Sequence, residues 1–241
     1  MIEKFKHFNK LYEKINNFSS LIDYTYLKNN ATVDDIKSVC GDAVENKYYS
    51  VCVMPDFVGS AKAFLDDEDV KICTVVSFPN GDDSTNSKVK ETLKAITDGA
   101  DEIDMVMDYK LLKELSIETG EEYDDIYKDL VDDVRSVSKV CHSDGLVLKV
   151  IIEVEELNYN QIKLACVICV EAGADMIMTS TGMSKTMKSF QEKIDQIKYI
   201  RKILPEYTKI KVSGGIRSID QINEVIPYVD RVATSIVIEN V

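Results

Sequence analysis

The sequence predicts a single-domain (β/α)8 TIM barrel over residues 1–241. Short β-rich runs alternate with helical patterns, which favours a parallel sheet. Eight such runs favour closure into a barrel over an open doubly wound sheet. Several runs also carry a charge in mid-strand, at Asp104, Lys149 and Lys211. Central strands of an open sheet would instead be nearly continuous apolar runs.

The expected strands are short runs rich in β-branched and apolar residues, at 20–25, 48–53, 70–78, 102–107, 146–154, 176–181, 209–214 and 230–235. The expected helices show helical patterns between most of these runs, at 32–46, 84–98, 122–142, 158–172, 187–204 and 219–227. A helix before the first strand is expected to cap the bottom of the barrel. The few residues after Ser235 predict a truncated last helix.

The composition limits the kinds of partner. A formal net charge of -13 argues against nucleic acid and anionic membranes, but it permits a small phosphorylated ligand in a locally positive pocket. The sequence contains no run of 18 or more apolar residues, so no membrane span is expected. The first residues are charged and lack the apolar core of a signal peptide. A cytoplasmic location is therefore expected.

Six cysteines are scattered along the chain, and two of them, Cys166 and Cys169, form a C-x-x-C motif. Metal or redox chemistry is one interpretation of this motif. Burial on one face of an apolar helix is favoured, because there is no second pair and the histidines, His7 and His142, are remote in sequence. Neither a metal nor a cofactor is expected.

Residues 209–217, KIKVSGGIR, alternate lysine with aliphatic residues. In a strand this pattern places Lys209, Lys211 and Ser213 on one face, while Ile210 and Val212 suit the helix side. Lys211 is therefore expected to point into the barrel, where burial would lower its pKa towards neutrality. Such an amine could be a nucleophile or a proton shuttle, but a structural ion pair is an equal alternative.

A carboxylate partner for Lys211 is available in residues 99–107, GADEIDMVM. Glu102, Asp104 and Val106 share one face of this run, and Asp104 lies in mid-strand. A carboxylate beside an amine can relay protons through a bound water. Backbone N–H groups of Gly214 and Gly215, together with the turn ending at Ser235, predict a phosphate site after the seventh and eighth strands.

The resemblance to a known family rests on blocks spread over nearly the whole chain. They are IDYTYL (22–27), SVCVMP (50–55), VSFPNG (76–81), the segment 88–107 that ends in GADEIDMVM, LKVIIE (148–153), GADMIMTSTG (173–182) and KVSGGIR (211–217). Together they resemble the deoxyribose-phosphate aldolases. That family implies a class I aldolase of deoxyribonucleotide catabolism, which reversibly cleaves 2-deoxyribose 5-phosphate to glyceraldehyde 3-phosphate and acetaldehyde through a lysine Schiff base.

The resemblance implies roles for individual residues. Asp104 and Lys211 match the acid/base pair, and the remaining matches are the pocket residues Asp23, Thr25 and Cys52, the substrate contacts Thr179, Thr181 and Gly182, and the phosphate residues Gly214, Gly215 and Ser235. These side chains, with Met178, are expected to converge at the C-terminal mouth of the barrel.

Three positions depart from the family pattern. Met178 stands where the family has its Schiff-base lysine, Ala233 where glycine is common, and Ile236 where a small or hydroxyl residue is usual. A thioether has no nitrogen and cannot condense with an aldehyde, so aldolase activity is expected to be absent or very weak. The alternatives are a catalytically silent protein that binds a sugar phosphate or a protein partner, and an aldolase that uses Lys211 as nucleophile. A homodimer is compatible with the family.

Overall fold

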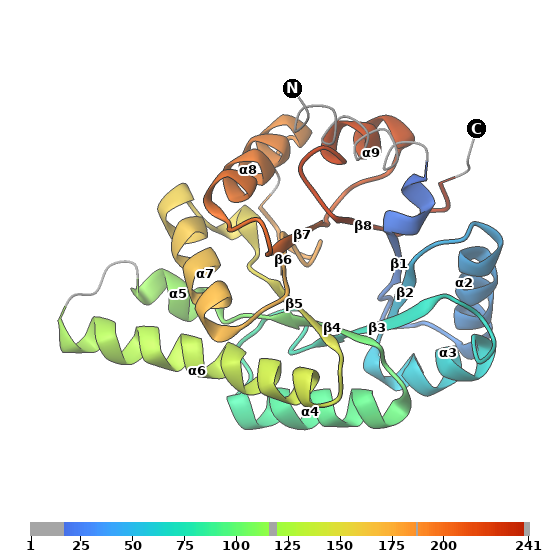
Figure 1. Cartoon of the computed structure of the whole chain (residues 1–241), viewed down its shortest axis with the longest axis horizontal. Helices are drawn as coiled ribbons and strands as arrows, with labels where there is room; N and C mark the ends of the chain where they lie inside the picture. The colour runs from blue at the N-terminus through green and yellow to red at the C-terminus, as the bar shows by residue number, and fades with distance from the viewer. Residues whose placement is uncertain (1–16, 116–119, 187, 239–241) are drawn as a thin grey trace.

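The computed structural model describes residues 17–115, 120–186 and 188–238, so the expected N-terminal helix lies outside the described residues. Eight parallel strands close into a barrel in the order of the sequence, and helices surround it (Figure 1). The strands are β1 (Ile22–Tyr26), β2 (Ser50–Val53), β3 (Lys71–Val76), β4 (Glu102–Val106), β5 (Val147–Ile151), β6 (Met176–Met178), β7 (Lys209–Val212) and β8 (Arg231–Thr234). The predicted (β/α)8 fold is confirmed.

Several strands end earlier than the sequence pattern predicts. β3 ends at Val76, before Ser77, and β5 ends two residues before Glu153. Ser77 and Glu153 have φ angles of 55° and 53°, in the left-handed region, where a strand cannot continue. The apolar sequence pattern continues beyond the ends of β3 and β5 because the loops that follow lie over the end of the barrel. Their side chains remain buried or half-buried there.

The helices are α2 (Val33–Glu45), α3 (Val58–Phe64), α4 (Thr85–Asp98), α5 (Tyr109–Leu115), α6 (Glu121–Ser143), α7 (Tyr159–Ala172), α8 (Phe190–Ile203) and α9 (Ile219–Val225), with 3-10 turns η1 (Phe18–Leu21), η2 (Pro55–Phe57) and η3 (Val154–Glu156). The sequence patterns predicted α9, at 219–227, but did not reveal α3 and α5, which have the same length of seven residues. The residues described after β8, 235–238, contain no helix. No helix in the described part of the chain has the length and apolar character needed to cross a membrane.

Side chains of helices and strands form the main core between the barrel wall and the outer helices. Inside the barrel lie two smaller apolar clusters, one around Cys52, Cys73 and Val75 and the other around Val106, Ile151 and Met178. Phe78 packs against both clusters. The barrel interior therefore has an apolar upper part, and this part forms the inner wall of the site described next.

Candidate functional site

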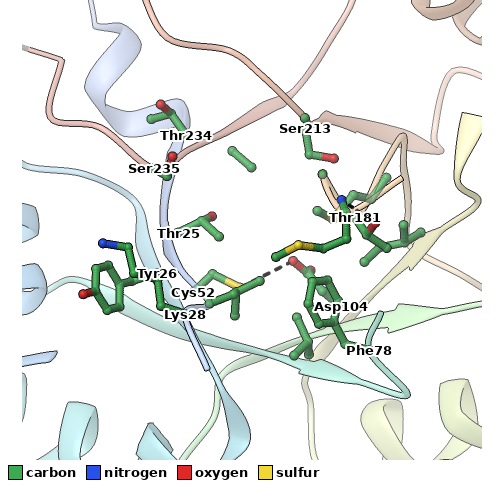
Figure 2. A pocket seen from close by; sticks show the side chains of 18 of the residues that line it. Thr25, Tyr26, Lys28, Cys52, Phe78, Asp104, Thr181, Ser213, Thr234 and Ser235 are labelled. Atoms are coloured by element: carbon green, nitrogen blue, oxygen red, sulfur yellow. Dashed lines mark hydrogen bonds between the residues drawn. The ribbon is translucent and has the colours of Figure 1, made fainter. Parts of the chain in front are cut away.

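A cavity of about 680 Å³ opens at the carboxyl end of the barrel (Figure 2). It is lined by strand ends and by the loops that follow them. The predicted site residues among its lining are Thr25, Cys52, Asp104, Met178, Thr181, Gly182, Gly214, Gly215 and Ser235. Val75, Phe78 and Ile151 add an apolar wall, and Lys28 and Arg217 add positive charge.

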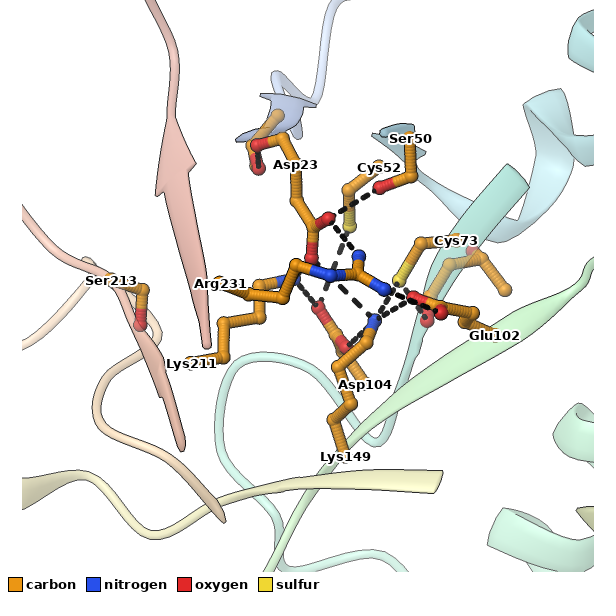
Figure 3. Close-up of polar contacts among 12 residues, drawn as sticks. Asp23, Ser50, Cys52, Cys73, Glu102, Asp104, Lys149, Lys211, Ser213 and Arg231 are labelled. Carbon is orange, nitrogen blue, oxygen red and sulfur yellow. Dashed lines mark hydrogen bonds and ion pairs between the residues drawn. The ribbon is translucent and has the colours of Figure 1, made fainter. Parts of the chain in front are cut away.

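Two further predicted residues, Asp23 and Lys211, are fully buried and are not among the lining residues. They belong to a network of charged side chains around Asp104 (Figure 3). The ammonium of Lys211 lies 2.6 Å from Oδ2 of Asp104 and 2.7 Å from Oδ2 of Asp23. The predicted contact between Lys211 and Asp104 is confirmed, and Asp23 is a second partner that the sequence did not reveal.

The remaining members of this network are Glu102, Lys149 and Arg231. Lys149 Nζ lies 2.8 Å from Asp104 Oδ1 and 2.8 Å from Glu102 Oε2. Arg231 donates from Nη1 to Asp23 Oδ1 at 2.6 Å and from Nη2 to Glu102 Oε1 at 3.1 Å. Three carboxylates thus face three cations, which is the balance that buried charges require. We call these six side chains the charge layer.

The charge layer corrects one expectation from the sequence. Burial by itself does lower the pKa of Lys211, as expected, but Asp104 and Asp23 outweigh it and raise the pKa above its ordinary value. Burial likewise raises the pKa of Asp104, while Lys149 and Lys211 reverse that effect and hold it below the ordinary value. The prediction of a nearly neutral Lys211 is therefore wrong, because it considered burial without the carboxylates.

Met178 ends β6 with its side chain buried, and it is paired in the sheet with Lys211 on β7 and Ile151 on β5. Its neighbours inside the barrel are Val106 and Ile151. Cys52 lies across the cavity, and its thiol is 3.8 Å from Asp104 Oδ2 (Figure 2). The inner end of the cavity is therefore formed by one ionised carboxylate among sulfur and hydrocarbon groups.

The outer end of the cavity is formed mainly by backbone. Gly182, Gly214 and Gly215 all have positive φ, at 77°, 84° and 82°. Within the described residues, their N–H groups and that of Ser235 make no hydrogen bond. Exposed N–H groups that converge on one place form an anion site. The side chain of Ala233 lines the same region.

Thr179 and Thr181 follow β6 but lie in different surroundings. Thr179 is buried away from the cavity lining, and its Oγ1 accepts a hydrogen bond from Ser213 N at 3.0 Å. Thr181 lines the cavity. The expected role of Thr181 in substrate contact suits its place, whereas Thr179 supports the loop after β7.

A second network joins the loops behind the outer end and was not found from the sequence. Glu153 accepts hydrogen bonds from both N and Oγ1 of Thr181. Glu155 accepts one from Ser180 Oγ at 2.5 Å and pairs with Lys193 Nζ at 3.0 Å, and Lys193 donates to Gly214 O at 2.5 Å. The acidic residue that ends LKVIIE, Glu153, and Glu155 two residues later were the only sequence signal for it.

Within the described residues, Cys52, Cys73 and Asp104 bring three potential metal-ligand atoms within 4.8 Å of one another. Lys149 Nζ lies 3.1 Å from Cys73 Sγ, and burial raises the pKa of that thiol well above its ordinary value. A protonated thiol beside an ammonium group disfavours a cation. Cys166 and Cys169 are free thiols buried in α7, as the structural interpretation of the C-x-x-C predicts.

Comparisons with known proteins agree with this architecture. The profile of the DeoC/LacD family aldolases matches residues 18–227. The chain is 40% identical to a deoxyribose-phosphate aldolase of Mycoplasmoides pirum over 87% of this chain and 89% of that protein. It is 41% identical to one of Caldanaerobacter subterraneus, over 86% and 84%.

A tetrameric deoxyribose phosphate aldolase from Aeropyrum pernix superposes with a TM-score of 0.79 at 25% identity, covering 95% of this chain and 92% of that one. The overall fold and the sequence therefore agree with those of these proteins. The chain belongs to the DeoC/LacD family of aldolases.

Proposed function

We propose that this chain binds a small phosphorylated sugar, such as 2-deoxyribose 5-phosphate, and that its cleavage through a Schiff base is absent or very slow. The observation that carries this proposal is the position of the amines. In the part of the chain that the structure describes, Lys28, exposed at the rim, is the only lysine that lines the cavity. The inner end holds Met178, where the family resemblance implies the Schiff-base lysine.

Imine formation requires an unprotonated amine that can reach the carbonyl carbon. The thioether of Met178 reaches the cavity but has no nitrogen, although it fills the slot of a lysine at similar length. The curated relatives are named deoxyribose-phosphate aldolases. We therefore propose that the scaffold is shared with them while the covalent step is lost.

An aldolase that uses Lys211 as nucleophile is the weaker alternative. Two carboxylates hold this ammonium at 2.6 and 2.7 Å, and they raise its pKa. Attack would require breaking both ion pairs inside the barrel, which costs several kcal/mol per uncompensated charge. The geometry favours Lys211 as the partner that keeps Asp104 ionised, and the pair remains our candidate for acid/base chemistry.

The two ends of the cavity suit the two ends of a sugar phosphate. The free N–H groups near Gly214 and Ser235 would receive the phosphate. The apolar wall at Val75, Phe78 and Ile151 would face the less polar deoxygenated carbons. Ala233 and Ile236 are proposed to weaken this binding, because a Cβ or a branched side chain crowds a close backbone approach.

The Aeropyrum pernix relative is described as tetrameric. We propose that this chain also self-associates, with a homodimer as the smallest assembly, in the cytoplasm. Binding of a protein partner, the other role open to a catalytically silent protein, stays a prediction.

Borohydride trapping tests the covalent step. Wild-type protein is incubated with acetaldehyde or 2-deoxyribose 5-phosphate, reduced, and mapped by peptide mass spectrometry. We expect no adduct on any lysine of the barrel interior. A stable adduct on Lys211 that is lost in Lys211→Met would refute the proposal and establish the alternative.

Calorimetric titration with 2-deoxyribose 5-phosphate tests the binding step. Gly214→Ala should abolish binding, because a Cβ there would lie 3.2 Å from Lys193 Nζ and from Ser180 Cβ. Gly145→Ala is the matched control, since Gly145 also has positive φ but has nothing within 4 Å of the added Cβ. Equal binding by both variants would place the ligand elsewhere.

A further inference from the structure

Behind the outer end of the cavity lies Glu153, a buried acidic residue that does not line the cavity. Its φ of 53° turns the chain sharply after β5 and aims the carboxyl group at the loop after β6. A non-glycine residue in this region is strained and persists only where the surroundings hold it. Glu153 accepts hydrogen bonds from the backbone N–H and the hydroxyl of Thr181, and the carboxyl group of Glu155 lies beside it.

Thr181 is the link between Glu153 and the ligand space, and Figure 2 shows it among the side chains around the cavity. Its Oγ1 also accepts a hydrogen bond from Met183 N at 3.0 Å. A threonine hydroxyl has one hydrogen to donate and two lone pairs. With one lone pair engaged by Met183, the state of Glu153 decides what the hydroxyl offers to a ligand.

The two states of Glu153 have opposite consequences. An ionised Glu153 can only accept hydrogen bonds. The Thr181 hydroxyl therefore donates its hydrogen to the carboxylate, and only a lone pair of Oγ1 faces the ligand. A protonated Glu153 can donate its proton to Oγ1 or to the neighbouring Glu155 carboxylate, and as a neutral acid it is the weaker acceptor, so the threonine hydrogen can turn to an anionic ligand oxygen. Because the bound group is an anion, the second arrangement attracts it, whereas the first adds a nearby negative charge.

We propose that Glu153 is a positioning residue that switches Thr181 between donor and acceptor and thereby sets the affinity of the cavity for the phosphate end of its ligand. This inference rests on the proposed sugar-phosphate function and extends it to a residue outside the cavity. Glu153 acts through Thr181 and touches no ligand itself.

The surroundings of Glu153 allow this switch near neutral pH. Burial raises its pKa to about 7, the Thr181 hydrogen bonds oppose that rise, and the charge of Glu155 adds to it. The other charged or titratable groups facing it are Tyr109 on α5 and, through Glu155, Lys193 on α8. Burial raises the pKa of Tyr109, and Lys193 is engaged by Glu155 and Gly214 O.

Sulfate is the probe for the experiment, because it stays a dianion between pH 6 and 8 whereas phosphate itself titrates. Its dissociation constant is measured by calorimetry at both pH values. If protonated Glu153 is the competent state, affinity follows the protonated fraction, and binding should be roughly tenfold tighter at pH 6 than at pH 8.

Three variants separate the switch from other causes. Glu153→Gln carries an amide that can donate to Thr181 at any pH, so it should bind tightly and equally at both values. Thr181→Val should bind weakly and equally. Glu156→Gln is the matched control, since it removes the same charge from the same turn while Ser184 and Thr186 hold the pKa of Glu156 down at about 2. It should keep the wild-type pH dependence.

The outcomes distinguish this inference from the function on which it rests. Sulfate binding without a pH dependence, or with one that survives in Glu153→Gln, overturns the switch and leaves the anion site standing. No sulfate binding by the wild type at either pH overturns the anion site and the switch together. Thermal unfolding of each variant confirms that the folded protein is being compared.

Discussion

The charge layer and the outer end of the cavity are built in opposite ways. In the charge layer, six side chains from five strands face one another, and cations and carboxylates balance. At the outer end, glycine backbone carries N–H groups that have no partner within the described residues. A network that is already paired holds its shape, whereas unpaired donors await a ligand. The difference teaches that the two regions depend on different parts of the chain, the charge layer on paired side chains and the outer end on backbone conformation.

The same two regions respond to pH with opposite sign. Asp23 and Asp104 have pKa values below the ordinary range, so their stabilisation is present at neutral pH and is lost as pH falls below about 4. Glu153 has a raised pKa, so its contribution is complete at low pH and is lost as pH rises through about 7. The protein is therefore expected to be most stable in mildly acidic solution.

The largest effect is expected from Met178→Lys, which adds an amine to the inner end. The new lysine would neighbour Lys211 in the sheet, and because Asp104 is already paired with Lys149 and Lys211, this like charge with burial should leave part of the new amine unprotonated. Retro-aldol activity towards 2-deoxyribose 5-phosphate should rise by roughly 10^2-fold or more in a coupled assay for glyceraldehyde 3-phosphate. Met178→Leu, which adds no amine, should show no gain. If the wild type is already as fast as the lysine variant, Met178 does not limit the retro-aldol activity.

The next effect concerns the stability of the charge layer. Asp104→Asn leaves Lys149 and Lys211 each short of one carboxylate, which should lower the free energy of unfolding by about 3–5 kcal/mol. Ser235→Ala at the exposed outer end should change it by less than about 0.5 kcal/mol. Urea denaturation of both variants measures the contrast, and equal losses would show that the charge layer is not specially sensitive.

A smaller effect is expected on the pH dependence of the free energy of unfolding. In the wild type, the unfolding free energy should decrease between pH 5 and pH 8 by on the order of 1–3 kcal/mol, because ionising Glu153 is easier in the unfolded chain. Glu153→Gln should remove that decrease, and Glu156→Gln should retain it. If the slope persists in Glu153→Gln, another group is responsible.

The smallest effect is expected at the rim. Lys28 is exposed and lies 4.9 Å from the centre of the Tyr26 ring, where solvent screens its charge. Lys28→Ala should weaken binding of 2-deoxyribose 5-phosphate by less than about threefold. A loss comparable to that of Gly214→Ala would mean that the rim, and not the backbone, holds the phosphate.

Much of the site could be predicted because its residues lie in or next to strands that the sequence pattern indicates. The alternation around Lys211 and the mid-strand position of Asp104 placed both side chains inside the barrel, and both are fully buried. The short helices α3 and α5 were not predicted, whereas α9, of the same length, was. Glu153 escaped prediction because nothing in the sequence shows that its backbone turns left-handed.

The sequence by itself determined the order of the eight strands and the face of the strand on which Asp104 and Lys211 lie, because side-chain direction follows a period of two in strands. Only the tertiary structure decided which charges meet. Lys211 contacts Asp104, 107 positions away in the chain, and also Asp23 on β1. Electrostatic interaction acts through space and not along the chain. The direction of the pKa shift of Lys211 was therefore set by the closure of the barrel.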